Sequence, residues 1–237
     1  MSADSHTFYF KKFHLKHDRC AMKVGTDGVL LGAWAKAHLP KRVLDLGTGS
    51  GLIALMLAQR FPTATIDALE IDCQAATQAA ENFKESAWNE RICLINADFK
   101  DFEAQHNYDL IVCNPPFFPA QNPSPNAVRA LARSVTHFSL AVFFQKCFEW
   151  LQPHGSLQLI FPFEDEELWR HQAMEAGFYV TYCTKVRGHE NAPFKRMLTV
   201  FEKVEKPVTT DSLTIETNRH QYTDEYKSLT QAFYLNF

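Results

Sequence analysis

Apolar residues in this chain form short runs that alternate with longer amphipathic segments. The runs have the length and composition of buried strands, and they lie at residues 43–44, 65–70, 92–96, 108–113 and 156–161. Patterns with helical spacing fall between or beside them, at 28–38, 52–60, 74–84 and 164–176. Strands that alternate with helices predict an α/β domain with a mostly parallel sheet.

The C-terminal part of the chain breaks this alternation. Residues 178–186 and 196–204 follow each other as two strands, which predicts an antiparallel hairpin. A polar connector follows at 207–220, with a short strand at 212–216. The apolar residues of the tail recur at helical spacing and predict an amphipathic helix docked on the core: Tyr222, Tyr226, Leu229, Phe233 and Phe237.

Together these patterns predict one domain over residues 1–237 with a Rossmann-like, mostly parallel seven-stranded sheet, helices on both faces and a C-terminal antiparallel hairpin. Its parts are an N-terminal extension with a pocket-covering helix (8–40), a catalytic core (41–206), and the connector with its docked helix (207–237).

Composition narrows the functional classes. A chain of 237 residues with 46% hydrophobic content can bury a full core. The net charge of −3 does not indicate a nucleic-acid binder, so a basic patch must be sought locally. The cysteines form no C-x-x-C pair, and we expect no metal site. Without a signal segment or a membrane-spanning run, the chain reads as cytoplasmic, with no membrane partner and no obligate protein partner evident.

Three glycines at alternate positions, Gly47, Gly49 and Gly51, follow the strand at 43–44 and precede the helix at Leu52. A strand, a glycine turn and a helix form a ligand site in which the backbone is approached closely. A dinucleotide fingerprint requires a small residue at position 52. The order D-L-G-T-G-S-G, beginning at Asp45, instead resembles the first motif of S-adenosylmethionine-dependent methyltransferases.

Acidic residues follow the next two strands. Glu70 ends its strand and is placed to accept from ribose hydroxyls, while Asp98 and Phe99 suit the amine and the face of an adenine ring. Each acid is otherwise a strand-end or turn residue. Thr26 and Asp27 begin a helix beside the same pocket, either as its N-cap or as cofactor ligands.

The segment Asn114-Pro115-Pro116-Phe117 follows the strand at 108–113. Two prolines hold the backbone rigid and extended. An amide side chain and a backbone carbonyl can accept both hydrogens of a planar amine, and the aromatic ring can stack on its base. This arrangement aligns a weakly nucleophilic amine for methyl transfer. A structural proline turn is the alternative.

These residues resemble the motif of the N-amino methyltransferases: Asn or Asp, Pro, Pro, then Tyr, Phe or Trp. The wider chain resembles one family of this class I methyltransferase group, the bacterial tRNA1(Val) adenine-37 N(6)-methyltransferases. The similarity runs nearly end to end, through 17–28, 49–60, 114–116 and 229–235. It implies S-adenosylmethionine as cofactor, with Asn114 near both cofactor and amine, and the anticodon loop of a valine tRNA as substrate.

Basic residues mark candidate RNA contacts. One group alternates with aromatic residues near the N-terminus, a second follows the catalytic segment, and a third borders the loop of the C-terminal hairpin. These residues are Lys11, Lys12, Lys16, Arg19, Lys23, Arg129, Arg133, Arg187, Lys195 and Arg196. The alternatives are a solvated edge strand whose aromatic residues cap the core, a solvated helix face and a mobile loop.

Four other functions stay open at this stage. Guanine in ribosomal RNA and a protein glutamine carry amines of the same kind, although the basic and aromatic N-terminus favours RNA. A catalytically silent RNA-binding module would have no need of the segment 114–117. Leu52 and the proline segment argue against a nicotinamide-dependent dehydrogenase.

Overall fold

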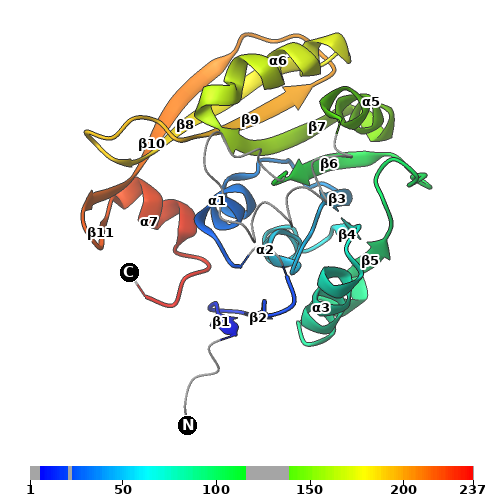
Figure 1. Ribbon diagram of the computed structural model, residues 1–237, viewed down its shortest axis with the longest axis horizontal. Helices are drawn as coiled ribbons and strands as arrows, with labels where there is room; N and C mark the ends of the chain where they lie inside the picture. Colours follow the sequence, from blue (N-terminus) through cyan, green and yellow to red (C-terminus); the bar gives the residue numbers. More distant parts are fainter. Residues whose placement is uncertain (1–5, 21–22, 116–138, 237) are drawn as a thin grey trace, which may run out of the picture.

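The computed structural model describes residues 6–20, 23–115 and 139–236. Nine strands of the described residues form one sheet of order β11-β10-β8-β9-β7-β6-β3-β4-β5, and β1 and β2 pair separately (Figure 1). The strands are β1 (Thr7–Tyr9), β2 (His14–Lys16), β3 (Arg42–Leu46), β4 (Thr65–Glu70), β5 (Ile92–Asn96), β6 (Tyr108–Cys113), β7 (Leu151–Pro162), β8 (Tyr179–His189), β9 (Arg196–Glu202), β10 (Thr209–Asn218) and β11 (Gln221–Tyr222). The helices are α1 (Thr26–Trp34), α2 (Leu52–Arg60), α3 (Cys73–Lys84), α5 (Leu140–Trp150), α6 (Glu166–Glu175) and α7 (Asp224–Thr230), with short 3-10 turns at Asn89–Arg91 and Phe163–Asp165.

The central strands are buried on both faces, which explains their continuous apolar sequences. Successive side chains of β6 point to opposite faces, so Leu110 and Val112 enter one core while Ile111 and Cys113 enter the other. Strands β5, β4, β3, β6 and β7 run parallel, and β9 is antiparallel to both β7 and β8. The predicted mostly parallel sheet with a C-terminal antiparallel hairpin is confirmed, but β10 and β11 extend it to nine strands among the described residues, where seven were predicted.

Helices cover both faces of the sheet. Figure 1 shows α5 and α6 on one side and α1, α2 and α7 on the other. The first core gathers the apolar side chains of α5 and α6, including Phe144 and Trp169. The second gathers those of α1 and α2, together with Phe83 of α3 and Tyr226 of α7. The sheet therefore separates two cores and keeps its strand ends accessible to ligands.

The connector prediction is wrong in part. Residues 209–218 form β10, a ten-residue strand that pairs in parallel with β8 and carries β11 on its other side. Leu213 is the one residue of β10 that is buried. The polar sequence hides this strand because it lies near the edge of the sheet. The docked tail is confirmed in part as α7, which carries Tyr226 and Leu229 and ends at Thr230. Tyr222 instead lies in β11, Phe233 follows the helix, and Phe237 lies outside the described residues.

The N-terminal segment forms the predicted hairpin, with Phe8 opposite Leu15. Phe10 and Phe13 are buried and stack on each other with ring centroids 4.6 Å apart. The aromatic residues of this segment therefore do cap the core. Among the described residues, no helix is long and apolar enough to cross a membrane.

Candidate functional site

The carboxyl ends of β4, β3 and β6 lie side by side and bring three predicted segments together. Leu46 of β3 is the register partner of both Leu69 of β4 and Cys113 of β6. The next residues along these strands are Gly47, Glu70 and Asn114. The sheet topology therefore places the glycine turn between the acid and the amide, as the ligand site of a parallel sheet requires.

The glycine turn leaves open space on one side and packs tightly on the other. Gly51 precedes α2 with φ +88°, and a Cβ there would lie 2.4 Å from Cε1 of Phe83. Gly49 has φ +56°, but a Cβ there, like one at Gly47, would meet no atom within 4 Å. Gly51 is therefore needed for packing, whereas Gly47 and Gly49 border space that a ligand can fill.

Asp45 is fully buried beneath this turn. Its Oδ2 atom accepts from Thr48 Oγ1 at 2.6 Å and from the backbone N–H of Ala54 at 2.9 Å. Its Oδ1 atom is buried without a hydrogen-bond partner among the described residues. Burial raises the pKa of Asp45 to about 7, the two hydrogen bonds oppose this rise, and the charge of Glu70 adds to it.

Glu70 is nearly buried and its carboxylate holds the turn in place. Oε2 accepts from the N–H of Gly49 at 2.8 Å, and Oε1 accepts from the N–H of Asp72 at 2.9 Å. Burial raises the pKa of Glu70, and these hydrogen bonds oppose the rise. A carboxylate offers about four lone-pair sites, so Glu70 keeps capacity for the ribose hydroxyls that we expect it to bind.

Asp98 and Phe99 follow β5 at the same edge of the sheet. Asp98 Oδ1 accepts from the N–H of Lys100 at 3.0 Å, and Oδ2 lies 3.3 Å from Lys100 Nζ. Phe99 meets the ring of Phe143 edge-on at a centroid distance of 6.3 Å. These contacts organise a turn, and the adenine role of the pair stays a prediction.

Asn114 carries the polar atom that most directly indicates a ligand at this edge of the sheet. Its Oδ1 atom is buried and has no hydrogen-bond partner among the described residues. An unsatisfied buried acceptor is costly and is found where a ligand or a catalytic role accounts for it. Pro115, the next residue, is buried. Pro116 and Phe117 lie outside the described residues, so their predicted roles stay predictions.

The helix start is not capped as predicted. Gly25 occupies the N-cap position of α1, and no side chain caps the helix. Thr26 is exposed, and Asp27 Oδ2 accepts from Arg196 Nε at 2.8 Å. A predicted cofactor residue and a predicted RNA residue are thus paired with each other, and both roles stay predictions.

The basic residues of the N-terminus are partly committed to protein groups. Lys11 Nζ donates to the carbonyl of Gln231 at 2.6 Å. Lys16 and Arg19 form ion pairs with acids of α3 and its C-cap, Glu85 and Glu81, at 2.6 and 2.9 Å. Lys12 and Lys23 are exposed. These pairs are solvent-exposed and weak, so they do not prevent a polyanion from binding.

The remaining predicted RNA residues lie elsewhere. Arg187 donates from Nε to Thr214 Oγ1 at 2.9 Å, and its guanidinium carbon lies 5.5 Å from the ring centroid of Phe194. Lys195, which follows Phe194 in the loop between β8 and β9, is exposed. Arg129 and Arg133 lie outside the described residues.

Three residues near the site were not predicted from the sequence. Thr48 is buried and orients Asp45, while Gln78 and Asn82 are buried amides on α3. Gln78 and Asn82 lie on the buried face of α3 beside Ala79 and Phe83. The two amides could have been recognised from the sequence, because amides that interrupt the apolar stripe of a helix must find buried hydrogen-bond partners.

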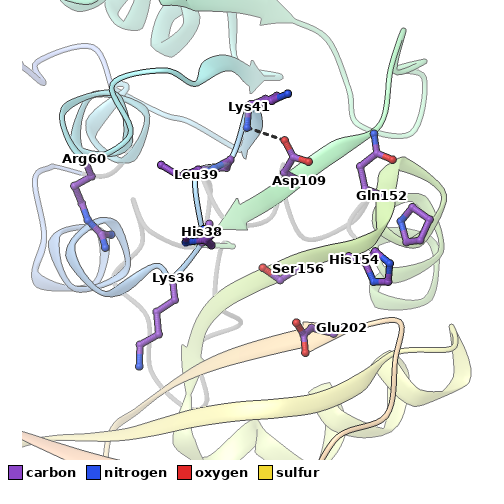
Figure 2. A pocket seen from close by; sticks show the side chains of 13 residues that line it. Lys36, His38, Leu39, Lys41, Arg60, Asp109, Gln152, His154, Ser156 and Glu202 are labelled. Atoms are coloured by element: carbon purple, nitrogen blue, oxygen red, sulfur yellow. Dashed lines mark hydrogen bonds between the residues drawn. The ribbon is translucent and has the colours of Figure 1, made fainter.

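A large open cavity lies at the opposite edge of the sheet (Figure 2). It measures about 1000 Å³, and its lining includes Lys41, which precedes β3, Asp109 near the start of β6, and Ser156 within β7. Arg60 at the end of α2 and Glu202 at the end of β9 also line it. Lys41 donates its backbone N–H to Asp109 at 2.7 Å. None of the lining residues belongs to the predicted site. The predicted ligand site at the carboxyl edge is thus separate from this cavity and stays a prediction.

Comparison with known proteins gives the chain a family. The family model described as "Methyltransferase small domain" matches residues 23–184. A protein of Christiangramia forsetii named tRNA1(Val) (adenine(37)-N6)-methyltransferase is 43% identical over 233 residues, which span 96% of this chain and 97% of the relative. A Flavobacterium psychrophilum protein of the same name is 45% identical over 235 residues, or 96% of this chain and 99% of the relative.

Solved structures agree on the fold. A predicted O-methyltransferase from Agrobacterium tumefaciens superposes with a TM-score of 0.69 at 19% identity, covering 87% of this chain and 96% of that chain. The glycopeptide N-methyltransferase MtfA, solved with S-adenosylmethionine, gives a TM-score of 0.57 at 13% identity, covering 77% of this chain and 100% of that chain. At this level of identity, the likeness shows a methyltransferase fold.

Proposed function

The chain belongs to the tRNA1(Val) (adenine(37)-N6)-methyltransferase family, and from this premise we propose that it methylates N6 of adenine 37 in a valine tRNA with S-adenosylmethionine as donor. It is an α/β methyltransferase by family and by fold. The observation that carries the proposal at the site is the Oδ1 atom of Asn114, which is buried, has no hydrogen-bond partner in the part of the chain that the structure describes, and follows β6 beside the glycine turn.

The residues at the carboxyl edge fit this cofactor. The space beside Gly47 and Gly49 accommodates a ligand against the backbone, as glycine turns in such folds do. Asp45 and Glu70 supply buried carboxylates, and a cofactor with a positively charged amino-acid part and a ribose needs an acid and hydroxyl acceptors. When bound, S-adenosylmethionine supplies an electrophilic methyl group on its sulfonium.

Asn114 orients the amine that receives the methyl group. Its Oδ1 atom accepts one amino hydrogen of adenine, and the carbonyl of Pro115 accepts the other. These two acceptors draw the nitrogen away from planarity and direct its lone pair along the line of attack. With the cofactor bound, this lone pair would bond to the methyl carbon while the C–S bond breaks, S-adenosylhomocysteine would leave with the bonding electrons, and the surplus proton would pass to water or a loop carbonyl. Phe117 would stack on the base.

Adenine must leave the anticodon stack to reach Asn114. Unstacking a base from a loop costs less than extracting it from a duplex. The N-terminal basic residues, with Lys12 and Lys23 exposed, can contact phosphates of the anticodon arm. This contact supplies affinity, whereas the fit of the base beside Asn114 supplies specificity.

A methyl-transfer assay tests the proposal. Labelled S-adenosylmethionine is incubated with the protein and with unmodified total tRNA, ribosomal RNA or a release-factor peptide, followed by digestion and mass spectrometry. The proposal predicts N6-methyladenosine in a valine tRNA. Methylguanosine in ribosomal RNA, or methylglutamine in the peptide, would show that ribosomal RNA or a release factor is the substrate instead of tRNA. No product with intact cofactor binding would contradict the activity.

A further inference from the structure

Asn82 of α3 is a buried amide that joins two segments lying far apart in the chain. Its side chain is 1% exposed. Oδ1 accepts from the backbone N–H of Lys16 at 3.0 Å, and Nδ2 donates to the carbonyl of Lys16 at 2.9 Å. The amide thus pairs with β2 as a neighbouring strand would, and it fixes the end of the N-terminal hairpin beside α3 (Figure 1).

The same side chain also holds the glycine turn. Asn82 Nδ2 donates its second hydrogen bond to the carbonyl of Ser50 at 2.8 Å. Ser50 lies between Gly49 and Gly51 and is buried. The neighbouring side chain on α3, Phe83, fills the space where a Cβ of Gly51 would stand. One short stretch of α3 therefore sets the position of the turn beside the cofactor space.

Gln78 lies one helical turn before Asn82 and offers a natural contrast. It is equally buried, and it holds the N-terminal segment through the N–H of Arg19 at 2.8 Å and Asp18 Oδ1 at 2.7 Å. Each side-chain hydrogen bond that Gln78 makes with described residues goes to residues 18–20. Gln78 therefore anchors only the basic segment, whereas Asn82 forms hydrogen bonds with both the segment and the glycine turn.

We propose that Asn82 is a positioning residue that couples the N-terminal basic segment, residues 14–20, to the glycine turn, so that RNA and cofactor raise each other's affinity. This inference rests on the function proposed above. RNA that orders the segment fixes Asn82, and Asn82 then fixes the carbonyl of Ser50, so the cofactor meets an ordered turn. Because such coupling is reciprocal, the cofactor must tighten RNA binding by the same factor.

Calorimetry measures the coupling. The affinity for S-adenosylhomocysteine is determined with and without a valine tRNA transcript, for the wild type, Asn82→Ala and Gln78→Ala. We expect tRNA to tighten binding about fivefold in the wild type. The factor should fall to about one in Asn82→Ala. It should persist in Gln78→Ala even though that variant binds tRNA more weakly. Equal factors in all three proteins would overturn the inference.

Hydrogen exchange of the wild type keeps the inference testable if Asn82→Ala does not fold. Adding tRNA should slow exchange in peptides covering residues 47–53, and adding S-adenosylhomocysteine should slow exchange in residues 14–20. Exchange that changes only where each ligand binds would overturn the coupling. In that case the protein would still methylate tRNA. If the proposed function were wrong, the protein would not methylate tRNA at all, so the two failures can be told apart.

Discussion

The carboxylate of Glu70 and the backbone N–H of Gly49 are joined by a hydrogen bond of 2.8 Å, which ties the end of β4 to the turn that follows β3. Glu70 shapes the turn through this bond, and its remaining lone pairs can accept from the ribose hydroxyls that we propose it binds. Removing the side chain should therefore weaken cofactor binding in two ways, by loosening the glycine turn and by removing acceptors for the ribose hydroxyls.

Glu70→Ala is expected to weaken S-adenosylmethionine binding by about 10- to 100-fold, because a hydrogen bond to a charged group contributes roughly 1.5–3 kcal/mol. Isothermal titration calorimetry without RNA measures this change. Glu205, an exposed acid, serves as the matched control, and Glu205→Ala should bind as the wild type does. Equal affinity of the Glu70 variant and the wild type would remove Glu70 from the cofactor site.

Two glycine substitutions should separate packing from ligand space. Both residues have positive φ, which costs an alanine roughly 1–2 kcal/mol. Gly51→Ala also collides with Phe83, so its melting temperature should fall further than that of Gly49→Ala. Gly49→Ala should fold and lose at least about tenfold in cofactor affinity, since its methyl group enters the ligand space. Unchanged cofactor affinity in Gly49→Ala would contradict this assignment.

Cofactor binding should release protons at pH 6 and fewer at pH 8. The buried Asp45 has a pKa of about 7, so it is largely protonated at pH 6. A bound cation favours the carboxylate and expels the proton, and affinity should therefore rise from pH 6 to pH 8. Calorimetry in buffers of different ionisation enthalpy measures the release. Asp45→Asn should reduce it, and an unchanged release would assign the proton to another group.

Stability provides an independent check on Asp45. Its folded pKa lies above the unfolded value of about 3.9. The native state binds more protons between about pH 4 and 7, so the contribution of Asp45 to stability is present below pH 4 and is lost as the pH rises to 7. Asp45→Asn should flatten this part of the profile of unfolding free energy against pH. An unchanged slope would show that Asp45 does not titrate there.

Replacing Lys11, Lys12 and Lys16 together by alanine should weaken tRNA binding and reduce the slope of log affinity against log salt by about 2 to 3. Lys12 should contribute most, because Lys16 is already paired with Glu85. Fluorescence anisotropy at several salt concentrations measures the slope. A control variant replaces three exposed residues elsewhere: Arg170, Lys206 and Arg219. The same slope in both variants would show that the N-terminal segment does not contact RNA.

Much of the fold could be predicted because its central elements end at strong sequence signals. The helix at 52–60 and the strands at 65–70, 92–96 and 108–113 have the predicted bounds. Each is an apolar or amphipathic run followed within two residues by a proline or by an acidic turn residue. For the strand at 209–218 only the middle, 212–216, was predicted, because a strand near the sheet edge buries little apolar surface.

The site was predictable where one short segment carries it and less so where distant residues meet. The glycine turn and Asn114 stand out in the sequence. The pairing of Asp27 with Arg196 joins residues 169 positions apart, and no local pattern reveals it. The bond from Gly49 to Glu70 and the double role of Asn82 likewise depend on how strands and helices are placed beside each other.

Single-turnover methyl transfer tests the central claim most directly. Enzyme in excess, with labelled S-adenosylmethionine, is mixed with a valine tRNA transcript carrying adenine 37 or with one carrying guanine there. The wild type should place N6-methyladenosine at position 37 of the first transcript and leave the second unlabelled. Asn114→Ala should react about 10²- to 10³-fold more slowly while binding the cofactor nearly as well. Label in the guanine transcript, or wild-type rates in the variant, would contradict the account.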